Sequence, residues 1–109
     1  MAARYVLSRL GTQYRFVLKA GNNEIILTSE LYASKQGALT GIASVKTNSP
    51  DDSRYERKSA ANGQPMFNLK AANGERIGTS ETYSSTQARE AGIQAVKNSG
   101  PTAPVDDQA

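Results

Sequence analysis

The sequence predicts an α+β domain made of two tandem β-β-β-α repeats that share one antiparallel sheet with pseudo-two-fold symmetry. Three observations support this prediction. Residues 16–50 align without a gap to residues 67–101, and 18 of the 35 aligned positions are identical. Apolar and polar residues alternate in the first part of each copy, as in half-buried strands. The last part of each copy instead has apolar residues at helical spacing.

The two repeats are expected to form a single domain. A unit of about fifty residues buries too little apolar surface to be stable alone. The 109-residue chain therefore predicts one domain over residues 1–100, with repeat 1 at 4–50 and repeat 2 at 54–100. Because each repeat supplies what a single copy would gain by dimerising, we expect a monomer.

Three strands are expected in repeat 1, at residues 4–10, 13–20 and 24–32. In the second strand Phe16 and Leu18 share one side, with Tyr14 and Ala20, while the residues between them face the other side. A two-residue turn after this strand would set Leu18 opposite Leu27. A three-residue turn with a bulge would bring Ile26 to the side of Phe16, and the shared Ile26/Ile77 pair favours this register.

A helix follows the strands in each repeat, at residues 35–47 and 86–98. Ser34 and Ser85 are suited to cap their N-termini, and a capping box formed by Ser84 and Gln87 is the alternative in repeat 2. Each helix contains a glycine, which costs about 1 kcal/mol relative to alanine. Its recurrence predicts a close approach of the helix backbone to the sheet.

Repeat 2 is expected to form its strands at residues 54–60, 66–71 and 76–83, with turns at Asn62-Gly63 and Asn73-Gly74. Residues 101–109 lack apolar periodicity. We expect this tail to be mostly disordered.

The doubled pattern Leu-Lys-Ala-x-Asn-x-Glu, Thr-Ser-Glu-x-Tyr-x-Ser and Gly-Ile-x-x-Val-Lys resembles the YegP-like family of small bacterial proteins. The resemblance covers residues 5–101. It implies a β(3)-α-β unit, doubled or dimerised, with one shared sheet and exchanged C-terminal strands, and it implies no established activity. Eight of the residues that recur in both copies are expected to have structural roles: Asn22, Glu30, Tyr32, Gly41, Asn73, Glu81, Tyr83 and Gly92.

The composition excludes several kinds of site. The chain has no cysteine, no histidine and no tryptophan, so disulfides, thiolate metal sites and a histidine general base are excluded. We expect no catalytic residue, no metal site and no cofactor. The N-terminal residues contain no apolar run suited to a signal peptide or membrane span, which predicts a soluble cytoplasmic protein with no membrane partner.

The function that the sequence favours is a non-enzymatic binding or assembly module. Its candidate surface is the polar sheet face, and an exposed sheet edge could recruit a partner strand from another protein. The candidate binding residues on that face are Arg15, Lys19, Lys70 and Arg76.

Two alternatives remain at this point. The net charge of +3 and pI near 9.3 allow weak nucleic-acid binding by the same basic face, with Tyr14, Tyr55 or Phe67 as stacking surfaces. The second alternative is an enzyme in which Glu30 and Glu81 meet across the two-fold axis as an acid/base pair.

Overall fold

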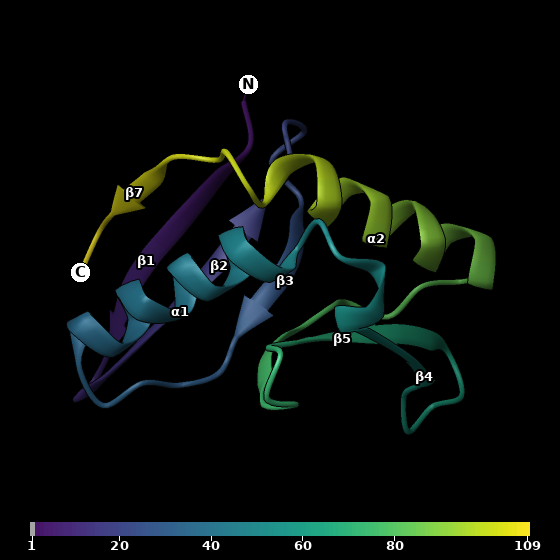
Figure 1. Ribbon diagram of the computed structural model, residues 1–109, viewed down its shortest axis with the longest axis horizontal. Coiled ribbons are helices and arrows are strands. Elements are labelled where there is room, and N and C mark those ends of the chain that lie inside the picture. The colour runs from purple at the N-terminus through teal and green to yellow at the C-terminus, as the bar shows by residue number, and fades with distance from the viewer. Residues whose placement is uncertain (1) are drawn as a thin grey trace.

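The computed structural model describes residues 2–109 and contains one sheet with both α-helices on one of its faces (Figure 1). The strand order is β4-β5-β6-β3-β2-β1-β7. The elements in chain order are β1 (Arg4–Leu10), β2 (Gln13–Lys19), β3 (Ile25–Ser29), α1 (Lys35–Asn48), the 3₁₀ helix η1 (Asp52–Arg54), β4 (Tyr55–Ser59), β5 (Pro65–Lys70), β6 (Arg76–Thr79), α2 (Thr86–Ser99) and β7 (Val105–Asp107).

The predicted α+β architecture of two β-β-β-α repeats is confirmed. Both helices begin at the predicted residue and extend one residue further than expected at their C-termini. Ser34 caps α1 by accepting a hydrogen bond from the Gly37 amide, and Ser85 caps α2 through the Ala88 amide. The cap of α2 is therefore Ser85 and not the alternative at Ser84.

The pseudo-two-fold axis passes between β3 and β6, which are the central strands of the sheet. Thr28 lies opposite its own repeat equivalent, Thr79, in this antiparallel pair. Each repeat thus contributes a three-stranded antiparallel half, and the two halves join through their third strands. None of the helices in residues 2–109 has the length and apolarity needed to span a membrane.

Both inner hairpins contain the predicted bulge. Lys19 lies opposite Ile25, and the register then shifts so that Leu18 lies opposite Leu27, the pairing expected for the two-residue turn. The equivalent shift in repeat 2 falls between Leu69 and Lys70. The extra residue in repeat 1 is Ile26, which is buried in the core as the bulged register requires.

The core lies between the helices and the sheet, and each repeat contributes an equivalent aromatic trio. In repeat 1 the Phe16 ring meets Tyr5 edge-on and stacks on Tyr32, with ring centroids 5.9 and 6.2 Å apart. Repeat 2 repeats this arrangement with Tyr55, Phe67 and Tyr83. Ile42 and Val45 of α1 and Ile93 and Val96 of α2 complete one continuous apolar cluster.

The segment after each helix contacts the first strand of the other repeat. The Tyr5 hydroxyl donates to the Gly100 carbonyl at 2.6 Å, and the Tyr55 hydroxyl donates to the Ser49 carbonyl at 2.7 Å. These paired contacts tie each helix C-terminus to the opposite half of the domain. The strand exchange that the family resemblance implied occurs in one copy: the strand after α2 (β7) pairs with β1 of repeat 1, whereas residues 49–54, which follow α1, form η1 and no equivalent strand.

The tail departs from the disorder that we expected for residues 101–109. Residues Val105–Asp107 form β7, which pairs in parallel with β1. The Tyr5 amide donates to Pro104, and the Gln108 amide donates to Leu7. Backbone hydrogen bonds to the edge of β1 and the buried Ala103 order the tail. Because backbone hydrogen bonds need no apolar periodicity, the sequence did not reveal this strand.

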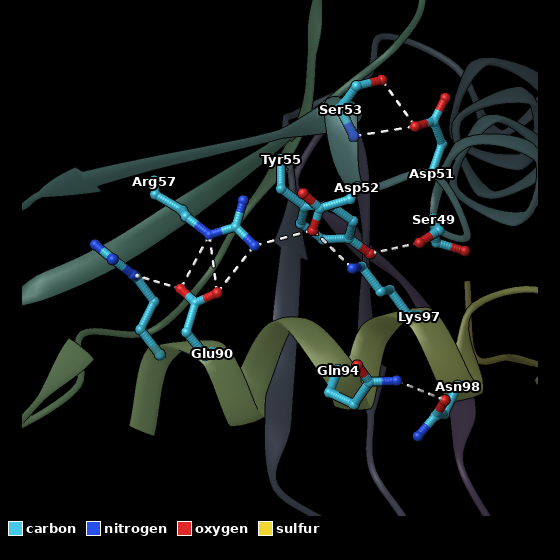
Figure 2. A network of polar contacts seen from close by, with 11 residues as sticks. Ser49, Asp51, Asp52, Ser53, Tyr55, Arg57, Glu90, Gln94, Lys97 and Asn98 are labelled. Atoms are coloured by element: carbon cyan, nitrogen blue, oxygen red, sulfur yellow. Dashed lines mark hydrogen bonds and ion pairs between the residues drawn. The ribbon is translucent and has the colours of Figure 1, made fainter. Parts of the chain in front are cut away.

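A charged network joins α2, η1 and β4 on the surface of repeat 2 (Figure 2). Arg57 bridges Glu90 and Asp52, with nitrogen-to-oxygen distances of 2.9 Å to each, and Lys97 contacts Asp52 at 2.7 Å. The pKa of Asp52 is lowered from 3.8 to about 2, chiefly by the hydrogen bond from Arg57 and then by that from Lys97. Two cations therefore hold one exposed carboxylate in its charged form.

This network predicts a stability change in acid. A carboxylate whose pKa is lower in the folded state stabilises that state above its unfolded pKa and loses this effect as the pH falls. For Asp52 the loss should occur between about pH 3.8 and pH 2. As the pH is lowered through this window, we expect the urea midpoint of Asp52→Asn to fall less than that of the wild type. Asp106→Asn is the control, since Asp106 forms no ion pair within residues 2–109; equal slopes for both variants would contradict the prediction.

Candidate ligand grooves

Two grooves lie on the helix side of the sheet, and each is formed by elements of both repeats. The first groove has a volume of about 380 Å³ and is bordered by α1 and the β5–β6 hairpin. The second, of about 490 Å³, is bordered by α2 and the β2–β3 hairpin. The first is lined by Glu30, Tyr32, Gly37, Thr40, Gly41, Ser44, Ala71, Asn73, Glu75, Arg76 and Ile77.

The two grooves are equivalent under the 51-residue repeat. Every residue of the first groove has its repeat partner in the second, which adds only Thr82. Seven of the eleven partner pairs are identical. The second groove is lined by Ala20, Asn22, Glu24, Ile25, Ile26, Glu81, Thr82, Tyr83, Ala88, Ala91, Gly92 and Ala95.

The eight recurring residues for which the sequence predicted structural roles all line these grooves, whereas other recurring residues, such as Phe16 and Phe67, do not. The recurring glycines have a clear packing reason. A Cβ atom at Gly41 would lie 2.3 Å from the Tyr32 hydroxyl oxygen, and one at Gly92 would lie 2.2 Å from that of Tyr83. The predicted close approach at these glycines is thus made by a tyrosine ring, which crosses the helix backbone at the wall of the groove.

Each tyrosine presents its hydroxyl to a groove while its ring packs in the core. Burial raises the pKa of Tyr32, and the Glu30 carboxylate raises it further. The pKa of Tyr83 is raised by burial and then by Glu81 and Glu24. Both hydroxyls therefore stay protonated at neutral pH and can donate hydrogen bonds to a ligand.

The recurring asparagines stabilise the hairpin turns at the groove edges. Asn22 Oδ1 accepts a hydrogen bond from the Glu24 amide at 3.1 Å, and Asn73 Oδ1 accepts one from the Glu75 amide at 3.0 Å. The next turn residue has positive φ in both copies, 71° at Asn23 and 86° at Gly74. Asparagine and glycine tolerate this conformation, so these positions are explained by turn geometry.

The twin acids lie in different grooves. Glu30 in the first groove accepts hydrogen bonds from Arg76 Nε at 3.1 Å and from Arg76 Nη2 at 2.8 Å. Glu81 occupies the equivalent position in the second groove. There the partner of Arg76 is Ile25, and no ion pair to Glu81 is formed within the described residues. The acid/base hypothesis requires the two carboxylates to meet in one cavity. They instead line separate grooves.

The four predicted binding residues do not lie together. Arg76 lines the first groove and pairs with Glu30. Lys70 contacts Glu56 at 3.1 Å on the sheet face opposite the helices, where Asn68 also donates to Glu56. These contacts lower the pKa of Glu56. Two of the four charges are thus neutralised locally, on different faces.

Arg15 and Lys19 lie on the open sheet face of repeat 1, on either side of Val17. The strand order puts β3 and β6 between Lys19 on β2 and Lys70 on β5. Three inter-strand spacings of about 4.8 Å separate these lysines by ~14 Å. The basic groups therefore form separate patches and not a stripe.

Apart from the recurring glycines, the helix residues that line the grooves were not predicted from the sequence. Thr40 and Ser44 of α1, and their partners Ala91 and Ala95 of α2, face the opposite hairpin. Their spacing of four residues, on the same helix face as the recurring glycine, was the available signal. This spacing does not reveal which hairpin forms the opposite wall of the groove.

Known proteins establish the family of the chain. The sequence model described as "Domain of unknown function (DUF1508)" matches residues 11–56 and again residues 60–107. The chain belongs to the DUF1508 family. The two family matches correspond to the two repeats, which confirms the predicted resemblance to YegP-like proteins.

Full-length relatives carry the same repeated domain. The chain is 56% identical over 108 residues to the UPF0339 protein YegP of Escherichia coli K12, covering 98% of each chain. It is 65% identical over 95 residues to a UPF0339 protein of Acinetobacter baylyi, covering 87% of this chain and 86% of the other. The names of these DUF1508 relatives indicate no catalytic family and no ligand.

Two solution NMR structures have the same fold. The UPF0339 protein of Shewanella oneidensis superposes with a TM-score of 0.90 at 55% identity, over 98% of this chain and 92% of that one. YegP of E. coli, described as a protein of unknown function, gives a TM-score of 0.92 at 55% identity, over 99% and 94% of the two chains.

Proposed function

We propose that this protein is a non-enzymatic binding module that holds its ligand in the two equivalent grooves. One observation carries the proposal: the eight recurring residues singled out in the sequence all line these grooves, whereas other recurring residues, such as Lys19 and Lys70, do not. Packing explains the glycines and turn geometry explains the asparagines. Neither accounts for a glutamate at the same groove position in both repeats, which supports a role in ligand contact.

The chemistry of the grooves favours binding over catalysis. Their polar groups are glutamates, protonated tyrosines, asparagines, the hydroxyls of Thr40, Ser44 and Thr82 and, in the first groove, one arginine. These groups accept or donate hydrogen bonds at neutral pH. A serine or threonine nucleophile would need an adjacent base, and histidine is absent from the sequence. The binding surface proposed here is thus the helix side of the sheet and not its basic open face.

Filling the grooves tests this proposal. Thr40→Trp and Ala91→Trp place a large side chain into the two grooves from exposed, repeat-equivalent helix positions. Ala43→Trp and Gln94→Trp are the matched controls, since these residues are also exposed and equivalent but line neither groove. We expect bacterial proteins or small molecules retained by the immobilised wild-type protein to be lost with the groove pair and kept with the control pair.

The opposite pattern would refute the groove proposal. If the groove-filled protein, with an unchanged thermal unfolding midpoint, retained every wild-type ligand, the grooves would not be the binding surface. A third variant, Lys19→Glu with Lys70→Glu, changes only the open sheet face. Loss of ligands in this variant alone would return the function to that face.

A further inference from the structure

The wall of the first groove includes a guanidinium group of the chain itself. Arg76 extends from β6 and places two of its nitrogens on one carboxylate oxygen of Glu30, at 3.1 and 2.8 Å. The two side chains are 50% and 40% exposed, so the contact is a partly exposed ion pair made by charge-assisted hydrogen bonds. The protein therefore already pairs an arginine side chain with the glutamate that lines one of its grooves.

The second groove has the same frame without the arginine. Glu81, Tyr83, Glu24 and Gly92 replace Glu30, Tyr32, Glu75 and Gly41, while Ile25 stands at the position of Arg76. The second groove is also the larger, with about 490 Å³ against about 380 Å³. The second groove therefore lacks the arginine of the first groove but retains the equivalent glutamate, Glu81.

We propose, building on the proposed function, that the second groove binds an arginine side chain presented by a partner polypeptide, with its guanidinium on Glu81. Arginine from a polypeptide is the ligand because the equivalent groove holds that group, delivered by a strand. The internal contact between Arg76 and Glu30 shows how a guanidinium group binds the glutamate. Because Glu81 is the repeat equivalent of Glu30, we expect the same contact at Glu81.

The lining of the second groove suits both ends of an arginine side chain. Two carboxylates, Glu24 and Glu81, supply negative charge, and none of the lining residues is cationic. In the turn that adjoins this groove, Arg4 Nη2 donates a hydrogen bond to Asn23 Oδ1 at 2.7 Å. The apolar lining of Ile25, Ile26, Ala88, Ala91 and Ala95 can cover the aliphatic stem.

A symmetry-exchange experiment tests the site. The probe is the capped peptide acetyl-Gly-Arg-Gly-amide, titrated into ¹⁵N-labelled protein while the backbone amide shifts are followed. In the wild type we expect saturable shifts at Glu81 and Tyr83 and none at Glu30 and Tyr32. Ile25→Arg should fill the second groove from within and abolish the shifts. Arg76→Ile should open the first groove and add saturable shifts at Glu30 and Tyr32.

A conservative variant keeps the test valid if Ile25→Arg fails to fold. Glu81→Gln preserves the shape of an exposed side chain and removes its charge. It should weaken peptide binding by about fivefold, since the guanidinium loses an ion pair with an exposed carboxylate. Unchanged affinity in Glu81→Gln, or shifts at Lys19 and Lys70 in place of the groove, would overturn the proposal.

Two further probes test whether the groove requires a guanidinium group and whether that group must belong to a polypeptide. The peptide acetyl-Gly-Lys-Gly-amide should bind about tenfold more weakly, because an ammonium group lacks the planar donor fork of a guanidinium. Butylguanidine carries the guanidinium and an aliphatic stem without a polypeptide or a second charge, and it should also bind more weakly. Equal binding of the lysine peptide would overturn the guanidinium specificity, and tighter binding of butylguanidine would overturn the polypeptide source.

Failure of this inference is distinguishable from failure of the proposed function. If the arginine peptide does not bind, but Ala91→Trp abolishes ligand retention, the groove remains a binding site and its ligand is not arginine. If neither the peptide binds nor the groove-filling variants change retention, both proposals fall.

Discussion

Phe16→Ala and Phe67→Ala are each expected to reduce the free energy of unfolding by about 3–5 kcal/mol. Both rings are fully buried, at 0% exposure, and each lies at the centre of an aromatic trio. Removal of either ring leaves a cavity beneath the neighbouring tyrosine and helix. Because a domain of this size has about 5–15 kcal/mol of stability in total, we expect the double variant not to fold.

The same variants test whether the repeats form one cooperative unit. The apolar residues of both repeats belong to a single cluster, so either substitution should lower one common transition. Urea unfolding followed by circular dichroism and by tyrosine fluorescence gives this directly. Leu31→Ala, at a position 53% exposed, is the control and should change stability by less than about 0.5 kcal/mol. Two separate transitions in Phe67→Ala, with repeat 1 unaffected, would contradict a shared core.

Gly92→Ala should cost about 1–3 kcal/mol even though alanine is the better helix former. The new Cβ would lie 2.2 Å from the Tyr83 hydroxyl oxygen and 2.6 Å from Cζ, so the ring must leave its place on Phe67. Displacement of that ring also changes the wall of the second groove. Gly92→Ala should therefore lose ligand retention together with stability.

A matched glycine distinguishes this clash from a general effect on the helix. Gly37 lies in α1, and the equivalent residue in α2 is Ala88, which shows that alanine fits this place in the repeat. Gly37→Ala should be neutral or stabilising. Replacing Tyr83 by leucine in the Gly92→Ala background should recover part of the loss by removing the clash. A fully stable Gly92→Ala protein with unchanged Tyr83 resonances would show that the close approach is not a constraint.

Local sequence signals predicted the elements of the fold well. The serine caps at Ser34 and Ser85 and the glycine-containing helices follow rules that act within a few residues, and the second copy repeated each signal. The bulged hairpins were also predictable, because the isoleucine shared by both repeats had to reach the core. Strand β7 was missed because its order depends on the edge of β1, about a hundred residues away in the sequence.

The site could be predicted only in part. The residues that recur between the repeats were visible in the sequence, but the grooves join each helix to the hairpin of the other repeat. Arg76 and Glu30 are separated by 46 residues, and no local pattern pairs them. The β-bulge beside Arg76 also breaks the simple alternation of side chains that had placed it with Lys70 on the open face.

Site-specific photo-cross-linking in bacterial cells tests most directly whether the grooves form the binding surface. A photoreactive phenylalanine analogue at Thr40 or Ala91 lies in a groove, whereas one at Ser8 or Lys58 lies on the open sheet face. We expect discrete cross-linked products from position 91, and from position 40 if both grooves are occupied, with none from positions 8 and 58. Products that arise from positions 8 or 58 alone would contradict the groove assignment and make the open face the functional surface.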